Sequence, residues 1–140
     1  MKPYFEKDFF AIYFNDVDQI IIAEWRIPPT SQEFREGMNV VIGALQFFNC
    51  GKIIFDTQML GVVLETDQDW ISTDWYERAR KAGYAQVAFI LPPDIITDMC
   101  VRETVELTTN RIPTAYFEDR SAAIDWITNA NSLVKQEFYQ

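Results

Sequence analysis

The feature that most constrains the fold is the run Lys-Ile-Ile-Phe at residues 52–55, which Asp56 and Thr57 follow directly. Its apolar side chains are β-branched or aromatic and do not alternate with polar ones, a pattern typical of a central strand covered on both faces. Helical patterns flank this run at residues 30–48 and 72–82. A helix, a buried strand and a second helix in succession predict a parallel sheet with right-handed crossovers.

The remaining pattern predicts an α/β protein with one mixed five-stranded sheet covered by about four helices. The short polar turn at 15–18 predicts that the first two strands form an antiparallel hairpin. Thr30 and Glu33 form a capping box at the start of the first long helix. The expected order is ββαβαβαβα, with strands at 9–14, 19–25, 52–55, 85–91 and 113–117. The helices are expected at 30–48, at 72–82 with Ser72 or Thr73 as the cap, from about Asp94 or Thr97 to 108, and to 127 after a cap at Asp119 or Ser121.

Other segments are expected to be irregular, although all of residues 1–140 belong to a single domain. Residues 1–7 read as a short lead-in, and residues 58–71 read as a loop that packs partly on the sheet, with a short strand or helical turn as an alternative. Gly51 is expected to supply the left-handed residue that ends the first helix. The polar tail at 129–140 is expected to fray.

Composition argues against several classes of function. A chain of 140 residues that is 49% hydrophobic can bury one sizeable core, so a disordered protein is excluded. The formal net charge of −9 argues against a nucleic-acid partner or an anionic membrane, because both need a basic surface. The absence of histidine removes Ser-His and Cys-His nucleophile pairs and most zinc sites. We therefore expect no enzyme, no metal and no cofactor.

The cysteines and the lack of a long apolar run bear on the location of the protein. Cys50 and Cys100 lie far apart in the sequence, and no signal peptide is apparent. We therefore expect the reducing cytoplasm, with both thiols structural. Cys50 is the better candidate for a reactive thiol, because it precedes Gly51 at a helix end. No run of 18 apolar residues occurs, so no membrane span is expected.

The element order and two phrases resemble the STAS, or SpoIIAA-like, superfamily, in particular its uncharacterised bacterial branch. One phrase is the strand at 52–55 ending in Asp56, and the other is the segment 115–127, in which an aromatic and acidic stretch is followed by Ala, Trp and an aliphatic residue. The resemblance covers residues 9–127 and implies a role in protein contacts. In the best-known members a partner kinase phosphorylates a serine beside an aspartate. By this resemblance Thr57 is a candidate phosphosite, although the expected helix begins some fifteen residues later.

The candidate site follows from the position of the central strand. Open α/β sheets bind ligands at the carboxyl ends of their strands, where Asp56 and Thr57 are expected. The apolar part of the loop at 58–71 and the tryptophans that follow it are interpreted either as core or as the wall of an apolar pocket. The residues expected to contact a ligand or partner are Asp56, Thr57, Met59, Leu60, Trp70 and Trp75.

The sequence is compatible with three functions. The first is a non-enzymatic regulatory module that works through contacts with another protein or with itself in a homodimer. The second is a carrier of a small apolar or amphipathic molecule held under the 58–71 loop. The third is an enzyme using carboxylate chemistry. It receives little support from the carboxylate pairs of the sequence, because aspartate in a turn or cap usually bonds the local backbone. These pairs are Asp16/Asp18, Asp67/Asp69 and Glu118/Asp119.

Overall fold

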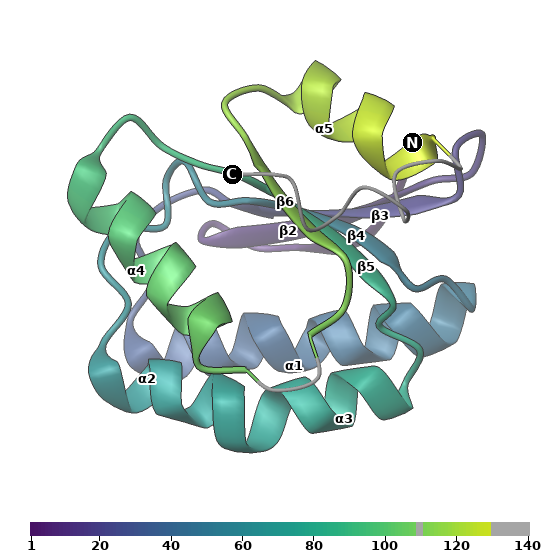
Figure 1. Ribbon diagram of the computed structural model, residues 1–140. Coiled ribbons are helices and arrows are strands. Elements are labelled where there is room, and N and C mark those ends of the chain that lie inside the picture. Colours follow the sequence, from purple (N-terminus) through teal and green to yellow (C-terminus); the bar gives the residue numbers. More distant parts are fainter. Residues whose placement is uncertain (109–110, 130–140) are drawn as a thin grey trace.

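Six strands form one mixed sheet in the computed structural model, which describes residues 1–108 and 111–129 (Figure 1). Their order across the sheet is the same as their order in the sequence. The strands are β1 (Lys2–Glu6), β2 (Phe10–Asn15), β3 (Ile20–Trp25), β4 (Lys52–Asp56), β5 (Gln86–Ile90) and β6 (Thr114–Phe117). The first two pairings are antiparallel, as the predicted hairpin requires, and β3 to β6 are parallel to one another.

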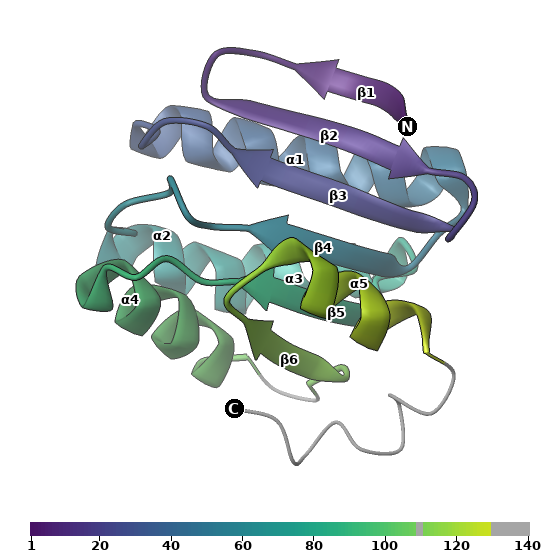
Figure 2. The ribbon, with the colours of Figure 1, turned by 90° about the horizontal axis from the view of Figure 1, so that it is seen from above.

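Helices cover the two faces of the sheet unequally (Figures 1 and 2). The connections between the parallel strands all lie on one face, while the last helix crosses to the other. This arrangement follows from right-handed crossovers, because strands added in one direction place each connecting helix on the same side. The helical segments are α1 (Ser31–Phe48), α2 (Glu65–Trp70), the π-helix η1 (Ile71–Trp75), α3 (Tyr76–Lys81), α4 (Ile95–Glu106) and α5 (Arg120–Thr128).

The central strand is confirmed. β4 lies between β3 and β5, and Ile53, Ile54 and Phe55 are at most 2% exposed. Because side chains alternate along a strand, Ile53 and Phe55 pack into the core under α1 and η1, whereas Ile54 packs into a second core with Trp126 of α5. Burial on both faces explains why this segment lacks polar alternation.

The expectation of five strands is wrong, because residues 2–6 form a sixth strand rather than a lead-in. β1 pairs with β2 at the edge of the sheet, and a register shift separates Pro3 from Phe5. None of its five residues is fully buried; only Tyr4 and Phe5 are even partly so. An edge strand has one partner and one exposed side, so its sequence need not show a continuous apolar run.

The second helix begins earlier than the sequence indicated. Residues 65–81 form one continuous helix, α2–η1–α3, so only the segment between Thr57 and Glu65 is a loop. Leu64 occupies the N-cap position without a side-chain hydrogen bond. The hydroxyls of Ser72 and Thr73, which were expected to cap the helix, donate instead to the carbonyl of Asp69 within it.

The first long helix starts as predicted but ends differently. Thr30 and Glu33 make both hydrogen bonds of the capping box. The left-handed residue at the end of α1 is Asn49, with φ of 48°, and not Gly51. Gly51 instead allows two backbone segments to approach closely, because a Cβ atom there would overlap the carbonyl oxygen of Gly83.

The last two helices begin at the earlier of the two positions expected for each. The carboxylate of Asp94 accepts from the backbone N–H of Ile96 at the start of α4, and that of Asp119 accepts from Ala122 at the start of α5. Both contacts are the standard N-cap bond. The tail expected to fray runs from residue 129 to 140, and its residues 130–140 lie outside the described residues.

Candidate functional site

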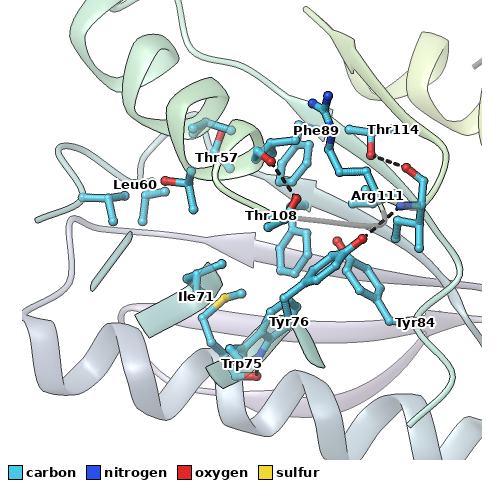
Figure 3. A pocket seen from close by; sticks show the side chains of 18 of the residues that line it. Thr57, Leu60, Ile71, Trp75, Tyr76, Tyr84, Phe89, Thr108, Arg111 and Thr114 are labelled. Atoms are coloured by element: carbon cyan, nitrogen blue, oxygen red, sulfur yellow. Dashed lines mark hydrogen bonds between the residues drawn. The ribbon is translucent and has the colours of Figure 1, made fainter. Parts of the chain in front are cut away.

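A cavity lies between the parallel strands and the helical layer beneath them (Figure 3). The sheet contributes Phe55 and Phe89 to its wall, η1 contributes Trp75, and α4 contributes Val101. The lining is mainly apolar, and the volume is about 80 Å³. This is roughly half of the ~150 Å³ apolar cavity that takes up benzene in an engineered protein. The cavity therefore suits a small molecule rather than a lipid chain.

The π-helix η1 shapes one wall of the cavity. Buried positions recur every four residues at Asp67, Ile71, Trp75 and Ala79. On an α-helix, with 3.6 residues per turn, each such step drifts by about 40° around the axis. A π-turn holds more residues per turn and takes up part of this drift, so Ile71 and Trp75 both face the cavity. The indole N–H of Trp75 donates to the carbonyl of Met38 in α1 at 2.6 Å, which fixes the ring.

Three stacked rings extend from the cavity to the edge of the sheet. Phe55, Phe89 and Tyr116 are in register on β4, β5 and β6, with successive centroids 5.7 Å apart. The guanidinium of Arg102 in α4 lies 4.5 Å from the Tyr116 ring centroid. Burial raises the pKa of Tyr116 to about 12, so this ring is neutral at physiological pH. The Arg102–Tyr116 contact ties α4 to the sheet.

Helix α4 covers the cavity with few buried contacts of its own. Within α4 only Thr97 and Val101 are fully buried. The side-chain amide of Gln68 donates to the carbonyl of Cys100 at 3.1 Å and joins α4 to α2. The cavity residues on its second half, Thr104 and Val105, are partly exposed. Because a helix with little buried area opens at low cost, we expect a ligand to enter the cavity beside α4.

The polar groups of the cavity differ in how well they are hydrogen-bonded. The Thr57 hydroxyl donates to the carbonyl of Ile90 at 2.8 Å, and the Tyr76 hydroxyl accepts from the backbone N–H of Ile112 at 3.0 Å. Tyr84 is 6% exposed, yet none of the described residues hydrogen-bonds to its hydroxyl. Burial raises the pKa of Tyr84 well above its ordinary value, and the neighbouring Tyr76 adds to this effect. Tyr84 is therefore a neutral hydroxyl with its proton available.

The structure brings together three of the six residues expected to form the site. Thr57, Leu60 and Trp75 all line the cavity. Met59 does not line it, since its side chain is 54% exposed on the surface of the 57–64 loop. Trp70 also lies outside, where the guanidinium groups of Arg35 and Arg78 approach its ring centroid to 5.0 and 5.7 Å.

Asp56 lies away from the cavity. Its carboxylate accepts from Arg120 at 3.2 Å, and the same guanidinium nitrogen donates to Glu24 at 2.9 Å. Glu24 also accepts from Arg26 at 3.1 Å. Burial alone would raise the pKa of Glu24, but the hydrogen bonds from Arg120 and Arg26 outweigh it and lower the pKa. This ionic cluster joins β3 and β4 to the first residue of α5. Asp56 therefore contacts α5, whereas Thr57 lines the cavity.

The other reactive or ligating groups considered from the sequence have local partners. Thr57 is 2% exposed, so a kinase cannot reach its hydroxyl in this conformation. Asp67 is also 2% exposed, and its carboxylate accepts from Ser31 and Arg35, each at 2.8 Å. Burial raises the pKa of the Cys50 thiol, and Cys100 is half-buried. In the described part of the chain, no group of three or more potential metal ligands occurs.

Sequence reasoning missed Tyr84 and the whole contribution of α4. Tyr84 stands between the helix stop at Gly83 and strand β5, where an aromatic residue carries no special pattern. Its only sequence signal is a large ring placed directly after a glycine turn. The role of Val101 was hidden, because the apolar residues of α4 do not form a clear stripe.

Comparisons of the chain with family models, with curated proteins and with solved structures gave no match. None of the helices in residues 1–108 and 111–129 is both long and apolar enough to cross a membrane.

Proposed function

We propose that this chain is a non-enzymatic binding module that takes a small, mainly apolar molecule into the cavity between the sheet and α4. The observation that carries the proposal is an apolar cavity of about 80 Å³ beneath a helix that buries only two of its own residues. Protein interiors are otherwise close-packed, and a void of this size lowers stability. A retained void with an easily opened cover is what a ligand-binding site requires.

The position of the cavity refines the carrier hypothesis. Leu60 and Val63 of the 57–64 loop line one part of the cavity, and Val101 and Val105 of α4 line another, so both segments cover it. Thr57 remains a polar contact for the ligand through its hydroxyl oxygen, whose proton is donated to Ile90. Asp56 is not part of the proposed site, because Arg120 holds its carboxylate elsewhere. For the same reason we propose no catalytic step at Asp56.

Binding of two apolar probes tests the proposal. Xenon and methylenecyclobutane are added to the protein, and chemical shifts of backbone and methyl groups are followed by NMR. We expect saturable shifts confined to cavity residues. Val101→Phe fills the cavity and should abolish them, whereas Met99→Phe adds the same ring on an exposed position of α4 and should not. Absence of saturable shifts in the wild-type protein would refute the proposal.

A second candidate function is a contact surface for another protein. Large apolar side chains that are 48–69% exposed follow the carboxyl ends of β3, β4 and β5; they are Ile27, Met59, Val62, Leu64, Ile95, Ile96 and Met99. Exposed acidic residues such as Glu65 and Asp94 lie next to them in the sequence. Apolar surface beside negative charge suits a basic amphipathic segment of a partner protein rather than a second acidic copy.

This second candidate is tested with a labelled basic amphipathic helical peptide. Binding measured by fluorescence anisotropy should be lost in Val62→Asp/Ile95→Asp. It should persist in Phe47→Asp, which changes an equally exposed apolar residue near the end of α1. Equal binding by the two variants would show that the exposed apolar residues after β3, β4 and β5 are not the contact surface.

The STAS-like assignment is proposed on topology alone. Four parallel strands follow one another across the sheet with their connections on one face, and this order supports the assignment. A regulatory role through protein contacts would then use the second surface. Phosphorylation of Thr57 would require the carboxyl ends of β4 and β5 to separate locally, because its hydroxyl donates a hydrogen bond to the carbonyl of Ile90.

A further inference from the structure

The hydroxyl of Tyr84 is a hydrogen-bond donor that lines the cavity and has no acceptor among the described residues. The residue is 6% exposed and belongs to the cavity wall. In Figure 3 its ring enters beside Tyr76, and its hydroxyl points into the cavity. Buried hydroxyls are normally hydrogen-bonded, because an unsatisfied one keeps its full desolvation cost. A donor left open at an apolar cavity indicates where a ligand atom belongs.

The threonine hydroxyls of the wall have already used their protons. Thr57 donates to Ile90, Thr104 to Cys100, Thr108 to Val105 and Thr114 to Ile112, in each case to a backbone carbonyl. These threonines can only accept a further hydrogen bond. The Tyr84 hydroxyl, in contrast, has no acceptor among the described residues, so it can donate to a ligand without breaking a bond with any of them.

The described residues of the cavity wall offer no buried charge to a ligand. Arg111 is the charged residue among the described members of its wall, and the side chain is 51% exposed beside Glu106. Figure 3 shows its guanidinium pointing away from the tyrosine hydroxyls. Burying a carboxylate or ammonium group without a partner costs several kcal/mol. A charged ligand is accordingly disfavoured.

We propose that the ligand is a small neutral molecule with a single oxygen acceptor, such as a ketone, ether or alcohol, which accepts a hydrogen bond from Tyr84. This inference rests on the proposed function and adds the chemical class of the ligand. Its hydrocarbon part fills the space between Phe89, Trp75 and Val101. A cavity about half the volume of one that holds benzene limits the ligand to a few heavy atoms.

A binding cycle with two shape-matched probes tests the role of Tyr84. Cyclobutanone and methylenecyclobutane differ only in an oxygen atom against a CH₂ group at the same position. Both are titrated by NMR against the wild-type protein, Tyr84→Phe and Tyr116→Phe. Tyr84→Phe removes one oxygen and keeps the ring, and Tyr116 is a control tyrosine outside the cavity wall.

We expect Tyr84→Phe to weaken cyclobutanone binding about five-fold, the equivalent of one ordinary hydrogen bond. Binding of methylenecyclobutane should stay the same, and Tyr116→Phe should change neither probe. If methylenecyclobutane binds and Tyr84→Phe leaves the ketone affinity unaltered, only the role of Tyr84 is overturned. If methylenecyclobutane does not bind the wild-type protein, the proposed function itself fails.

Discussion

Removing the hydroxyl of Tyr84 should stabilise the unliganded protein. A fully buried hydroxyl without a partner costs about 1–3 kcal/mol. The Tyr84 hydroxyl is not fully buried, because it faces an 80 Å³ cavity that admits a few waters, so we take the lower end of this range. Tyr84→Phe should therefore raise the free energy of unfolding by about 1 kcal/mol. For a chain of this length, that corresponds to an increase in Tm of about 3 °C.

Tyr76→Phe is the matched control, because it deletes the same atom from the same cavity with the opposite consequence. The Tyr76 hydroxyl accepts from the backbone N–H of Ile112, which would be left buried and unpaired. This variant should lose about 1–3 kcal/mol. Urea unfolding followed by tryptophan fluorescence measures both. A loss of 1 kcal/mol or more in Tyr84→Phe would refute the reasoning, because it would show that this hydroxyl has a partner in the native state.

Two further outcomes are expected from the packing of α1 and from the ionic cluster. Gly37→Ala should destabilise the protein by about 1–3 kcal/mol in thermal unfolding, because the new Cβ would lie 2.9 Å from the Phe10 ring. Gly43→Ala is the control. It should leave the stability unchanged or raise it by up to about 1 kcal/mol, because its Cβ meets only the end of a tyrosine side chain at 3.0 Å. A Gly37→Ala protein as stable as wild type would contradict this contact. The pKa of Glu24 is lowered in the folded protein, so its stabilising effect is complete above pH 4.5 and is lost as the pH falls through the folded-state pKa. Glu24→Gln should therefore make the free energy of unfolding depend less on pH between roughly pH 5 and 3. An unchanged acid limb would exclude a stabilising role for the Glu24–Arg120 pair.

Segments whose structure is set locally could be predicted from the sequence. The capping box of Thr30 and Glu33 and the unbroken apolar strand at 52–55 are local signals, and both are confirmed. β1 could not be recognised, because an edge strand has one partner and its five residues bury little. The start of α2 was missed for a different reason. Its polar run 65–69 resembles a loop, yet Asp67 is buried through distant hydrogen bonds to Ser31 and Arg35 of α1.

The candidate site was predictable only in part. Thr57, Leu60 and Trp75, three of the residues expected to contact a ligand, line one cavity. The position of Thr57 at the carboxyl edge of a parallel sheet follows from topology. Asp56 precedes Thr57 by one residue, and strand alternation sends adjacent side chains to opposite faces. A cavity, in contrast, is a property of how distant segments fit together. No pattern in the sequence records that α4 leaves space above Phe89.

The π-turn at residues 71–75 makes this helix tolerant of a deletion at one place. A π-turn holds one residue more than the α-helical stretch it replaces, so removing Ser72 or Thr73 would restore ordinary α-helical geometry. Seven steps of about 100° would then separate Asp67 from Trp75, which leaves the two side chains within about 20° of one face. Asp67 would keep its bonds to α1 while Trp75 stays on the cavity wall. The same deletion in the middle of α1, which is α-helical throughout, would instead rotate one half of that helix by about 100° relative to the other.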